Sequence, residues 1–226
     1  DAATKWPTRL PLPDEAVSLT ERGGWYAVVD FKRGYHQLRL ARDTRLDFTQ
    51  QHGGCQGHFL PRAASMGHTA SCGAFCTMTG ESLRAIRAAG VPASCYIDDF
   101  ICAGRTRAEC QRHLDTMLRI LRELGWQISP AKVVPPTQTA PWLGFVLDTR
   151  AGTITLSATR RAELRSLATE CLRNAHQCET RKLATLAGKL TWAAHAVPGA
   201  KAFVVAVSAL SRIPRQRVTL TPMARE

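Results

Sequence analysis

Short apolar runs are the main feature of residues 1–156, and most of them predict strands. The run WYAVVD, residues 25–30, is rich in valine and aromatic residues and predicts a buried strand that ends in a carboxylate. The run CYIDDFIC, residues 95–102, has two apolar arms around a pair of aspartates and predicts a hairpin with both acids at its tip. The alternating segment HQLRL predicts a half-exposed strand over residues 36–40. Shorter strands are expected at residues 126–128, 142–147 and 153–156.

Helical spacing of apolar positions predicts helices in both parts of the chain. One helix is expected over residues 71–89, before a Gly-Val-Pro stop signal. Thr106 and Glu109 form a capping box ahead of a second helix. From Ser157 onward, two apolar stripes predict two amphipathic helices joined around residues 176–180.

The order of these elements indicates the fold class. Strands and helices mix in residues 1–156, whereas helices dominate residues 157–226. We therefore expect an α+β domain followed by a separate helical unit. Ahead of the first strand, Pro7, Pro11 and Pro13 predict an extended segment.

The charge balance points to a polyanionic partner. The chain has 226 residues, with 30 Lys and Arg against 18 Asp and Glu, which gives a net charge of +12. The 70 residues after Leu156 carry 12 of the basic residues and only 4 of the acidic ones. Nucleic acid is the commonest partner of such a basic region, although a solubilising surface is the alternative. We expect no membrane partner, because no apolar stretch approaches the length of a membrane span.

The eight cysteines predict free thiols, because their density is low and no secretory signal precedes them. The N-terminus does not begin with Met, so we expect an excised piece of a protein that stays inside the cell. Cys55, His58, Cys72 and Cys76 loosely imitate a zinc finger. Several of these residues lie in runs typical of a core, so packing is the favoured interpretation.

Three aspartates carry the strongest chemical signal. Asp30 ends one predicted strand, and Asp98 and Asp99 occupy the tip of the predicted hairpin, where Asn-Gly or Asp-Gly is the usual choice. If the strands are neighbours, three like charges share one cleft and need a compensating cation. Mg²⁺ suits such a site, and two ions about 4 Å apart can activate a hydroxyl and stabilise a pyrophosphate leaving group. The alternative is an exposed acidic turn, with Asp30 capping the next segment.

Four segments in order resemble the reverse transcriptase domain of retrotransposons. They are VVDFKRGYHQLRL at residues 28–40, YIDDF at 96–100, LGWQISPAK at 124–132 and WLGFVL at 142–147. The resemblance implies a right-hand palm, an antiparallel sheet backed by helices, with partial fingers, over residues 1–156. The tail, residues 157–226, resembles more loosely the thumb or connection of the tyrosine-recombinase retrotransposon group.

The resemblance implies RNA-directed DNA polymerase activity, a nucleotidyltransferase that extends a primer 3′-end by two-metal phosphoryl transfer. Its cofactors would be two Mg²⁺ ions, with Mn²⁺ as a substitute. Its partners would be an RNA template with a DNA primer, or an RNA–DNA duplex, together with deoxynucleoside triphosphates. Residence in the cytoplasm or nucleus follows from the same resemblance.

The resemblance also implies catalytic roles. Asp30, Asp98 and Asp99 would hold the metal ions, with Asp99 contributing more by its charge, and the backbone of Phe31 would join the metal site. Lys132 would lie near the leaving phosphates as a charge or proton donor. A solvated loop lysine is the alternative for Lys132.

Other residues of the four segments would contact substrates. The nucleotide would meet Phe31, Lys32, Arg33, Gly34, Tyr35 and Gly67. Tyr35 falls where the family places a steric gate against the 2′-hydroxyl, and a packed tyrosine at a strand end is the alternative. The nucleic acid would meet Tyr96, Trp142, Leu143, Gly144, Arg160, Arg161, Arg165, Arg181, Lys182 and Lys189. An apolar hairpin and ordinary charged helix faces are the alternatives for these residues.

Two departures from the family pattern keep another function open. The segment FLPRAASMGHTASCGAF, residues 59–75, keeps Leu60, Pro61 and Gly67 but lacks the family's second proline. The basic finger motifs that grip the triphosphate usually precede Pro11 and are absent from this sequence. The alternative function is therefore a non-catalytic remnant or fragment of a reverse transcriptase that binds nucleic acid.

Overall fold

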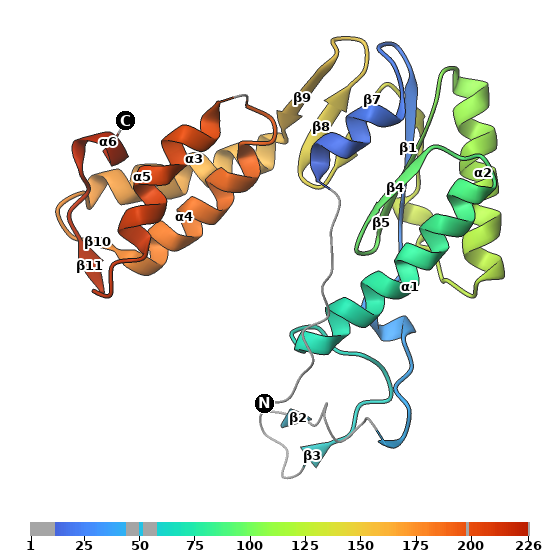
Figure 1. The fold of residues 1–226 in the computed structure, drawn as a ribbon, viewed down its shortest axis with the longest axis horizontal. Coiled ribbons are helices and arrows are strands. Elements are labelled where there is room, and N and C mark those ends of the chain that lie inside the picture. Colours follow the sequence, from blue (N-terminus) through green and yellow to red (C-terminus); the bar gives the residue numbers. More distant parts are fainter. Residues whose placement is uncertain (1–11, 44–49, 52–57, 198, 226) are drawn as a thin grey trace. The chain divides into compact units, whose positions relative to one another are not determined.

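The computed structural model describes residues 12–43, 50–51, 58–197 and 199–225 (Figure 1). The chain divides into two compact units. Unit 1 comprises residues 1–143 and 149–152, and unit 2 comprises residues 144–148 and 153–226. The hairpin around residues 145–156 therefore belongs mostly with the helical tail. The domain boundary that we expected at Leu156 stays a prediction. In the described part of the chain, none of the helices has the length and apolar character that crossing a membrane requires.

A four-stranded antiparallel sheet, in the order β4-β5-β1-β6, forms the centre of unit 1. The strands are β1 (Trp25–Asp30), β4 (Ala93–Tyr96), β5 (Asp99–Gly104) and β6 (Val134–Thr137). β1 lies in the middle of the sheet, which explains its almost continuous apolar run. β6 lies at the edge of the sheet, and its register against β1 shifts between Val134 and Thr137; edges and such irregularities are where prolines such as Pro135 and Pro136 are tolerated.

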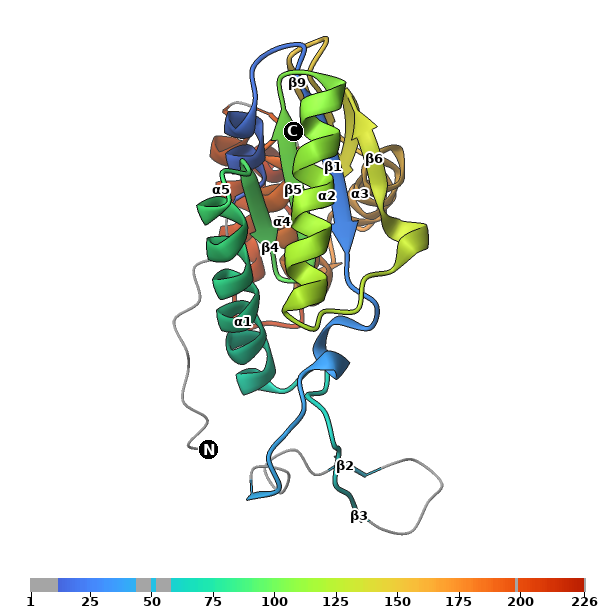
Figure 2. The same cartoon turned by 90° about the vertical axis from the view of Figure 1, so that its right-hand side faces the viewer.

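Two helices, α1 (Thr69–Ala88) and α2 (Arg107–Glu123), cover one face of this sheet (Figure 2). The capping box predicted for α2 is confirmed, because the Glu109 N–H donates to the Thr106 Oγ1 at 3.1 Å. Glu109 Oε2 in turn accepts from the Arg105 N–H at 2.7 Å, which satisfies one more backbone donor at the helix start. The helix predicted over residues 71–89 is confirmed as α1.

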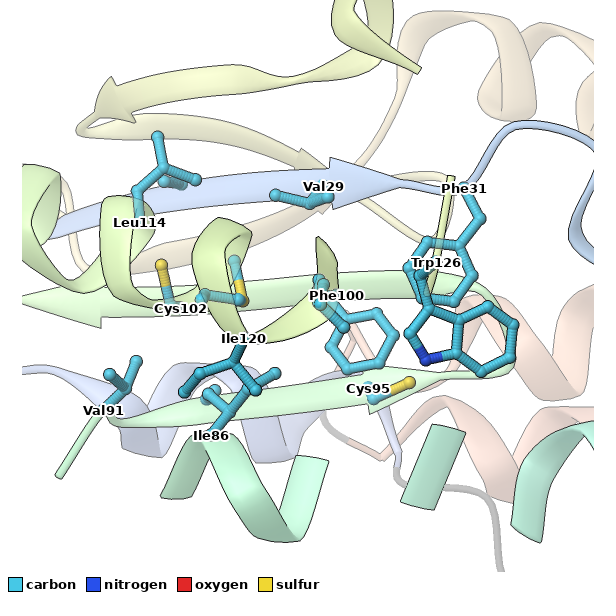
Figure 3. Close-up of a cluster of buried hydrophobic side chains, with 14 of the residues drawn as sticks. Val29, Phe31, Ile86, Val91, Cys95, Phe100, Cys102, Leu114, Ile120 and Trp126 are labelled. Atoms are coloured by element: carbon cyan, nitrogen blue, oxygen red, sulfur yellow. The ribbon is translucent and has the colours of Figure 1, made fainter. Parts of the chain in front are cut away.

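The core of unit 1 lies between the sheet and the two helices (Figure 3). Phe31 stacks on Trp126 with ring centroids 4.6 Å apart, and it lies 5.2 Å from Phe100. The Trp126 Nε1–H donates to the Ser82 Oγ at 2.8 Å, so this buried indole leaves no unpaired donor. The aromatic group therefore fixes the end of β1 that carries Asp30.

Short elements complete unit 1. They are the 3₁₀ helices η1 (Pro13–Leu19), η2 (Gly34–Gln37) and η4 (Pro130–Lys132) and the strands β2 (Gln50–Gln51), β3 (His58–Phe59) and β7 (Thr139–Trp142). β2 and β3 pair antiparallel, and η1 is tied to the sheet by Tyr26, whose hydroxyl donates to the Ala16 carbonyl at 3.0 Å.

Three expectations about these short elements were wrong. Residues 13–19 form η1 instead of an extended segment, because Pro13 occupies the first helical position, where its missing N–H costs nothing. Residues 34–37 form η2 instead of a strand, and only Arg39 bridges, to Ala63. No strand forms at residues 126–128, where Ile128 makes a single bridge to Phe31. Pro7 and Pro11 lie outside the described residues.

Unit 2 contains a hairpin and a helical bundle. Its elements are β8 (Phe145–Asp148), β9 (Thr153–Leu156), α3 (Ala158–Arg173), β10 (Cys178–Glu179), α4 (Thr180–Ala193), α5 (Ala200–Ser211), β11 (Arg217–Val218) and α6 (Pro222–Arg225). The two predicted amphipathic helices are α3 and α4, and their apolar stripes meet in a core that includes Leu183 and Leu186. The Phe145 ring lies 6.0 Å from the Trp192 ring, which joins the hairpin to α4.

The close packing of β5 against α2 can be tested at Gly104. A Cβ atom at this position would lie 2.5 Å from the Cys110 backbone nitrogen, so Gly104→Ala must push strand and helix apart. We expect a loss of about 2 kcal/mol or more in the free energy of unfolding. Urea unfolding measures it.

Gly80→Ala is the matched control, because Gly80 lies within α1 and a Cβ there meets no atom within 4 Å. This variant should gain about 0.5–1 kcal/mol from higher helix propensity. Equal stabilities for the two variants would contradict the packing of β5 on α2.

Candidate active site

The sheet register brings the three predicted carboxylates to one edge. Asp30 is the last residue of β1 and pairs directly with Asp99, the first residue of β5. Asp98 lies in the two-residue turn that joins β4 to β5. Residues directly opposite in an antiparallel pair have Cβ atoms about 4.5–5.5 Å apart. The close approach that the sequence predicted for Asp30, Asp98 and Asp99 is therefore present.

The turn that presents Asp98 is strained. Its first residue, Ile97, has a φ of +58°, although a β-branched side chain strongly disfavours the left-handed region. Arg33 and Leu143, with φ values of +60° and +52°, are the other non-glycine residues of the described chain with positive φ. All three lie in segments that resemble family motifs, and strain of this kind is concentrated at functional sites.

Burial and mutual repulsion disfavour the charged forms of the hairpin acids. Burial, then Asp98 and Asp30, raise the pKa of Asp99 to about 6, while Lys132 acts in the opposite direction. Burial is also the largest cause of the raised pKa of Asp98, and the charge of Asp30 adds to it. The site therefore holds more negative charge than its surroundings neutralise, which is the condition that favours a bound cation.

Lys132 supplies positive charge to these acids. Its Nζ donates to Asp30 Oδ2 at 2.5 Å, and this bond is the largest cause of the raised pKa of Lys132. The Lys132 side chain is 59% exposed and the Asp30 side chain 21% exposed. An exposed lysine on a short 3₁₀ helix can move, so this ion pair can open when another cation takes its place.

The segment between Asp30 and Tyr35 forms a close backbone turn around the acids. A Cβ on Gly34 would lie 3.0 Å from Asp98 Oδ2, so a side chain here would press on the carboxylate. The Phe31 side chain is buried, which leaves only its backbone for a metal or nucleotide. Lys32 and Arg33 are exposed, with Lys32 N–H donating to the Gln127 carbonyl at 2.9 Å.

Gln37 holds this turn in place, and the sequence analysis did not identify it. Its Nε2 donates to the Lys32 carbonyl at 2.8 Å and to the Gln127 carbonyl at 2.9 Å, and its Oε1 accepts from the Gln127 N–H at 2.7 Å. A polar residue in an alternating segment gave no signal of this role, because its partner lies 90 positions away.

Tyr35 packs against α1. Its ring lies 4.9 Å from the Phe75 ring, and burial and a hydrogen bond to Cys72 raise its pKa. Tyr96 pairs with Asp99 across the hairpin and is half-buried. Gly67, with a φ of +88°, is exposed just ahead of α1, and a Cβ atom at this position would meet nothing within 4 Å.

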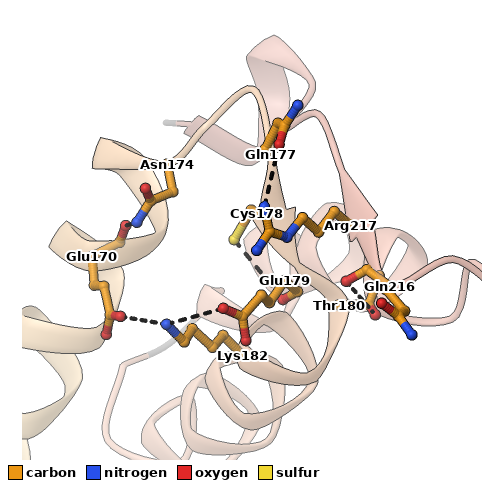
Figure 4. A network of polar contacts seen from close by, with 9 residues as sticks. All are labelled: Glu170, Asn174, Gln177, Cys178, Glu179, Thr180, Lys182, Gln216 and Arg217. Carbon is orange, nitrogen blue, oxygen red and sulfur yellow. Dashed lines mark hydrogen bonds and ion pairs between the residues drawn. The ribbon is translucent and has the colours of Figure 1, made fainter.

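The candidate nucleic-acid contacts differ in their surroundings. Trp142 is buried, so a strand could reach only its backbone, and the turn continues through Leu143 and Gly144. Lys182 pairs with Glu170 at 2.6 Å and with Glu179 at 3.5 Å (Figure 4). Lys189 and Arg160 share Glu163, at 2.9 Å and 3.7 Å, whereas the remaining candidates are exposed: Arg161, Arg165 and Arg181.

These ion pairs are compatible with a role of the basic residues in binding nucleic acid. Exposed pairs contribute about 0–1 kcal/mol, so a phosphate can replace a carboxylate partner at little cost. Their roles stay predictions, as do the roles of the acids.

The zinc-finger pattern gains no support from the described residues, in which no group of three or more His, Cys, Asp or Glu side chains is arranged to hold a metal ion. Cys55 lies outside the described residues, whereas the Cys72 and Cys76 sulfurs lie 4.0 Å apart. The carboxylates of Asp30, Asp98 and Asp99 are nevertheless suitable ligands for Mg²⁺, because this ion takes one or two carboxylates and completes its shell with water and phosphate oxygens.

Comparisons with known proteins agree with this geometry. Residues 3–147 match the sequence model of the family described as reverse transcriptase (RNA-dependent DNA polymerase). The chain is 26% identical over 144 residues to a retrovirus-related Pol polyprotein from the transposon gypsy of Drosophila melanogaster. That match covers 63% of this chain and 14% of the polyprotein.

Solved structures with a similar fold include the foamy viral protease-reverse transcriptase in complex with an RNA/DNA hybrid. This chain matches it with a TM-score of 0.68 and 16% identity, over 94% of this chain and 27% of the viral one. The same viral protein in complex with double-stranded DNA gives a TM-score of 0.65 and 16% identity, over 94% and 42% of the two chains. The fold is thus the α+β fold of these enzymes, and the chain, which spans between 14% and 42% of the length of these relatives, belongs to the reverse transcriptase family.

Proposed function

We propose that this chain is the polymerase core of a retrotransposon reverse transcriptase, which adds deoxynucleotides to a primer 3′-end on an RNA template. One observation carries the proposal, namely the direct pairing of Asp30 with Asp99 beside the Asp98 turn. In this arrangement burial and mutual repulsion raise the pKa values of Asp98 and Asp99, while Lys132 offsets the charge of Asp30. Family membership supports the same chemistry.

We propose that Asp30 and Asp98 bind two Mg²⁺ ions, or Mn²⁺ in their place, together with the Phe31 backbone, while Asp99 acts mainly through its charge. Such ions lower the pKa of the attacking hydroxyl and neutralise the leaving pyrophosphate. Lys132 would leave Asp30 and turn its ammonium group toward the leaving phosphates. The exposure of Lys132 in this ion pair permits that movement.

The residues from Lys32 to Tyr35 would receive the nucleotide. Exposed Lys32 and Arg33 would face its phosphates, and Gly34 allows the backbone close to Asp98. The Tyr35 ring, supported by Phe75, would lie under the sugar and collide with a 2′-hydroxyl. Gly67 would let the template approach the chain, because it carries no side chain.

Basic residues of unit 2 would contact the phosphates of the primer–template duplex, and the turn at Trp142 would support the primer end. The exposed Arg161, Arg165 and Arg181 would contact phosphates first, and Lys182, Lys189 and Arg160 would exchange their glutamates for phosphates. We propose the cytoplasm or nucleus as the compartment, because deoxynucleoside triphosphates and RNA would be its substrates.

A non-catalytic remnant is the less favoured alternative. A protein kept only for its basic surface would gain nothing from three crowded carboxylates and a strained turn, both of which reduce stability. Neutral side chains at the positions of the three aspartates would destabilise such a protein less.

Asp98→Asn tests the catalytic role. Loss of one metal-binding carboxylate should lower the rate of primer extension by about a thousandfold or more, because the metals supply most of the charge stabilisation. Duplex affinity, measured by fluorescence anisotropy, should change less than about twofold, within the roughly 1 kcal/mol of a surface charge. Asp115→Asn, an exposed carboxylate on α2, is the control and should keep normal extension. Retained extension by Asp98→Asn would refute the assignment.

Asp99→Asn tests the crowding of the acids through stability. The pKa of Asp99 is raised to about 6 in the folded chain. Because the folded form disfavours the carboxylate, the metal-free wild type is penalised above pH 6, and the penalty fades as the pH falls toward 4. The variant should therefore be about 1–2 kcal/mol more stable at pH 7 and equally stable at pH 4, as measured by urea unfolding in EDTA. A gain that does not depend on pH would contradict this origin.

Tyr35→Ala tests the sugar contact. Removing the ring should raise the incorporation of ribonucleotides relative to deoxynucleotides by at least about tenfold, because about 1.4 kcal/mol of steric rejection is lost. Tyr35→Phe keeps the ring and should keep the discrimination. If Tyr35→Ala discriminates as the wild type does, the ring is only a packing group on Phe75.

A further inference from the structure

Seven of the eight cysteines are described, and all seven are free thiols. Their exposure separates them into two classes. The buried class comprises Cys95, Cys102, Cys110, Cys171 and Cys178. Cys72 and Cys76 alone among the described cysteines are half-buried, so reagents in solution can reach them.

Cys72 and Cys76 lie one turn apart on the same side of α1, and their sulfur atoms are 4.0 Å apart. A disulfide needs about 2.05 Å between sulfurs, which is much shorter than the 4.0 Å separation of this pair. Two sulfurs bound to one tetrahedral ion at about 2.3 Å each lie about 3.8 Å apart. The observed separation therefore suits one atom bound between the sulfurs better than a bond joining them.

The thiol pair interacts with residues of the proposed nucleotide and metal sites. Burial, followed by the interaction with Cys72, raises the pKa of Tyr35, and the negative charge of Asp98 helps to raise the pKa of Cys76. Burial, Cys72 and Asp98 raise the pKa of Cys76 to about 12, which disfavours attack by this thiol alone on simple alkylating reagents. A positive or electrophilic atom held by both sulfurs would displace their protons.

We propose that Cys72 and Cys76 form a two-sulfur binding site for thiophilic species, namely soft metal cations such as Cd²⁺ and trivalent arsenicals. Soft sulfur ligands select such species, whereas the oxygen ligands of the aspartates select hard ions such as Mg²⁺. Two different cation sites thus lie within one active-site region of unit 1. Capture of a thiophilic species takes the Cys72 sulfur away from Tyr35 and fills the space beside its ring. Only this second effect, on the nucleotide, rests on the proposed function.

Phenylarsine oxide is the probe with the simplest chemistry. Its arsenic(III) condenses with both thiols, so two As–S bonds form and the As–O bond breaks. The two thiol protons leave with the oxygen as one water molecule. Arsenic keeps its oxidation state, and no oxidant or reductant is required.

Intact-mass spectrometry of the native chain with one equivalent of phenylarsine oxide should detect one adduct per chain. A dithiol should remove the adduct, whereas the same concentration of monothiol should not, because two sulfurs hold the arsenic. Cys72→Ser and Cys76→Ser should each weaken adduct formation at least tenfold. Cadmium binding, followed by thiolate-to-metal charge-transfer absorbance, should be lost in the same two variants.

The controls are Cys171→Ser, from a buried thiol of unit 2, and Cys55→Ser, which checks the cysteine outside the described residues. Both should form the adduct as the wild type does, with circular dichroism confirming the fold of every variant. An unmodified wild type, a full adduct on Cys72→Ser or a lost adduct on Cys55→Ser would each overturn the site.

The effect on the nucleotide is measured separately from the adduct. In the wild type, the arsenical should raise the KM for deoxynucleotides at least fivefold without changing duplex affinity, and Cys76→Ser should resist it. An unchanged KM in fully loaded wild type would overturn the effect on Tyr35. If the chain showed no polymerase activity at all, the proposed function would fail, while the adduct would still decide the thiol site.

Discussion

The antiparallel pairing of β1 with β5 is the constraint on which the rest of the site depends. It places Asp30 opposite Asp99, although like charges in that position destabilise a sheet. The pairing holds because the residues behind the acids, from Tyr26 to Val29 and from Phe100 to Ala103, are buried in register. A slip by one residue would turn every side chain of β1 to the other face of the sheet. The burial of the apolar side chains therefore also fixes the position of Asp30 opposite Asp99.

Unfavourable features gather at this end of the sheet, and the packing behind it offsets them. Ile97 and Arg33 occupy left-handed backbone conformations, and the hairpin acids have raised pKa values. Directly behind them, Phe31 stacks on Trp126 and lies beside the tilted ring of Phe100, and the indole nitrogen is hydrogen-bonded. A rigid aromatic layer beside a strained polar edge is a common arrangement of active sites, because strain persists only where neighbouring structure holds it.

Exchangeable ion pairs occur both at the candidate active site and on the helices of unit 2. At the site, Lys132 neutralises Asp30 through a contact that another cation can replace. On the helices of unit 2, Lys182 and Lys189 bind glutamates through exposed contacts of little net energy. In both places an exposed internal ion pair holds a basic group for which we propose a ligand contact, and the small net energy of the pair leaves that group available for exchange.

The sequence alone determined the features that depend on neighbouring residues. The buried strand ending at Asp30, the acidic hairpin, the capped start of α2 and the apolar stripes of α3 and α4 arise from local periodicity and capping, which operate over a few positions. Family motifs added the expected roles.

Tertiary structure decided the features that depend on residues far apart in the sequence. Gln37 bends the expected strand into η2 through contacts with Gln127, and glutamates up to 26 positions away pair with the basic residues of α4. Burial also distinguished Cys72 and Cys76 from the other five cysteines that the structure describes, because exposure is a property of the packed chain and not of spacing along it.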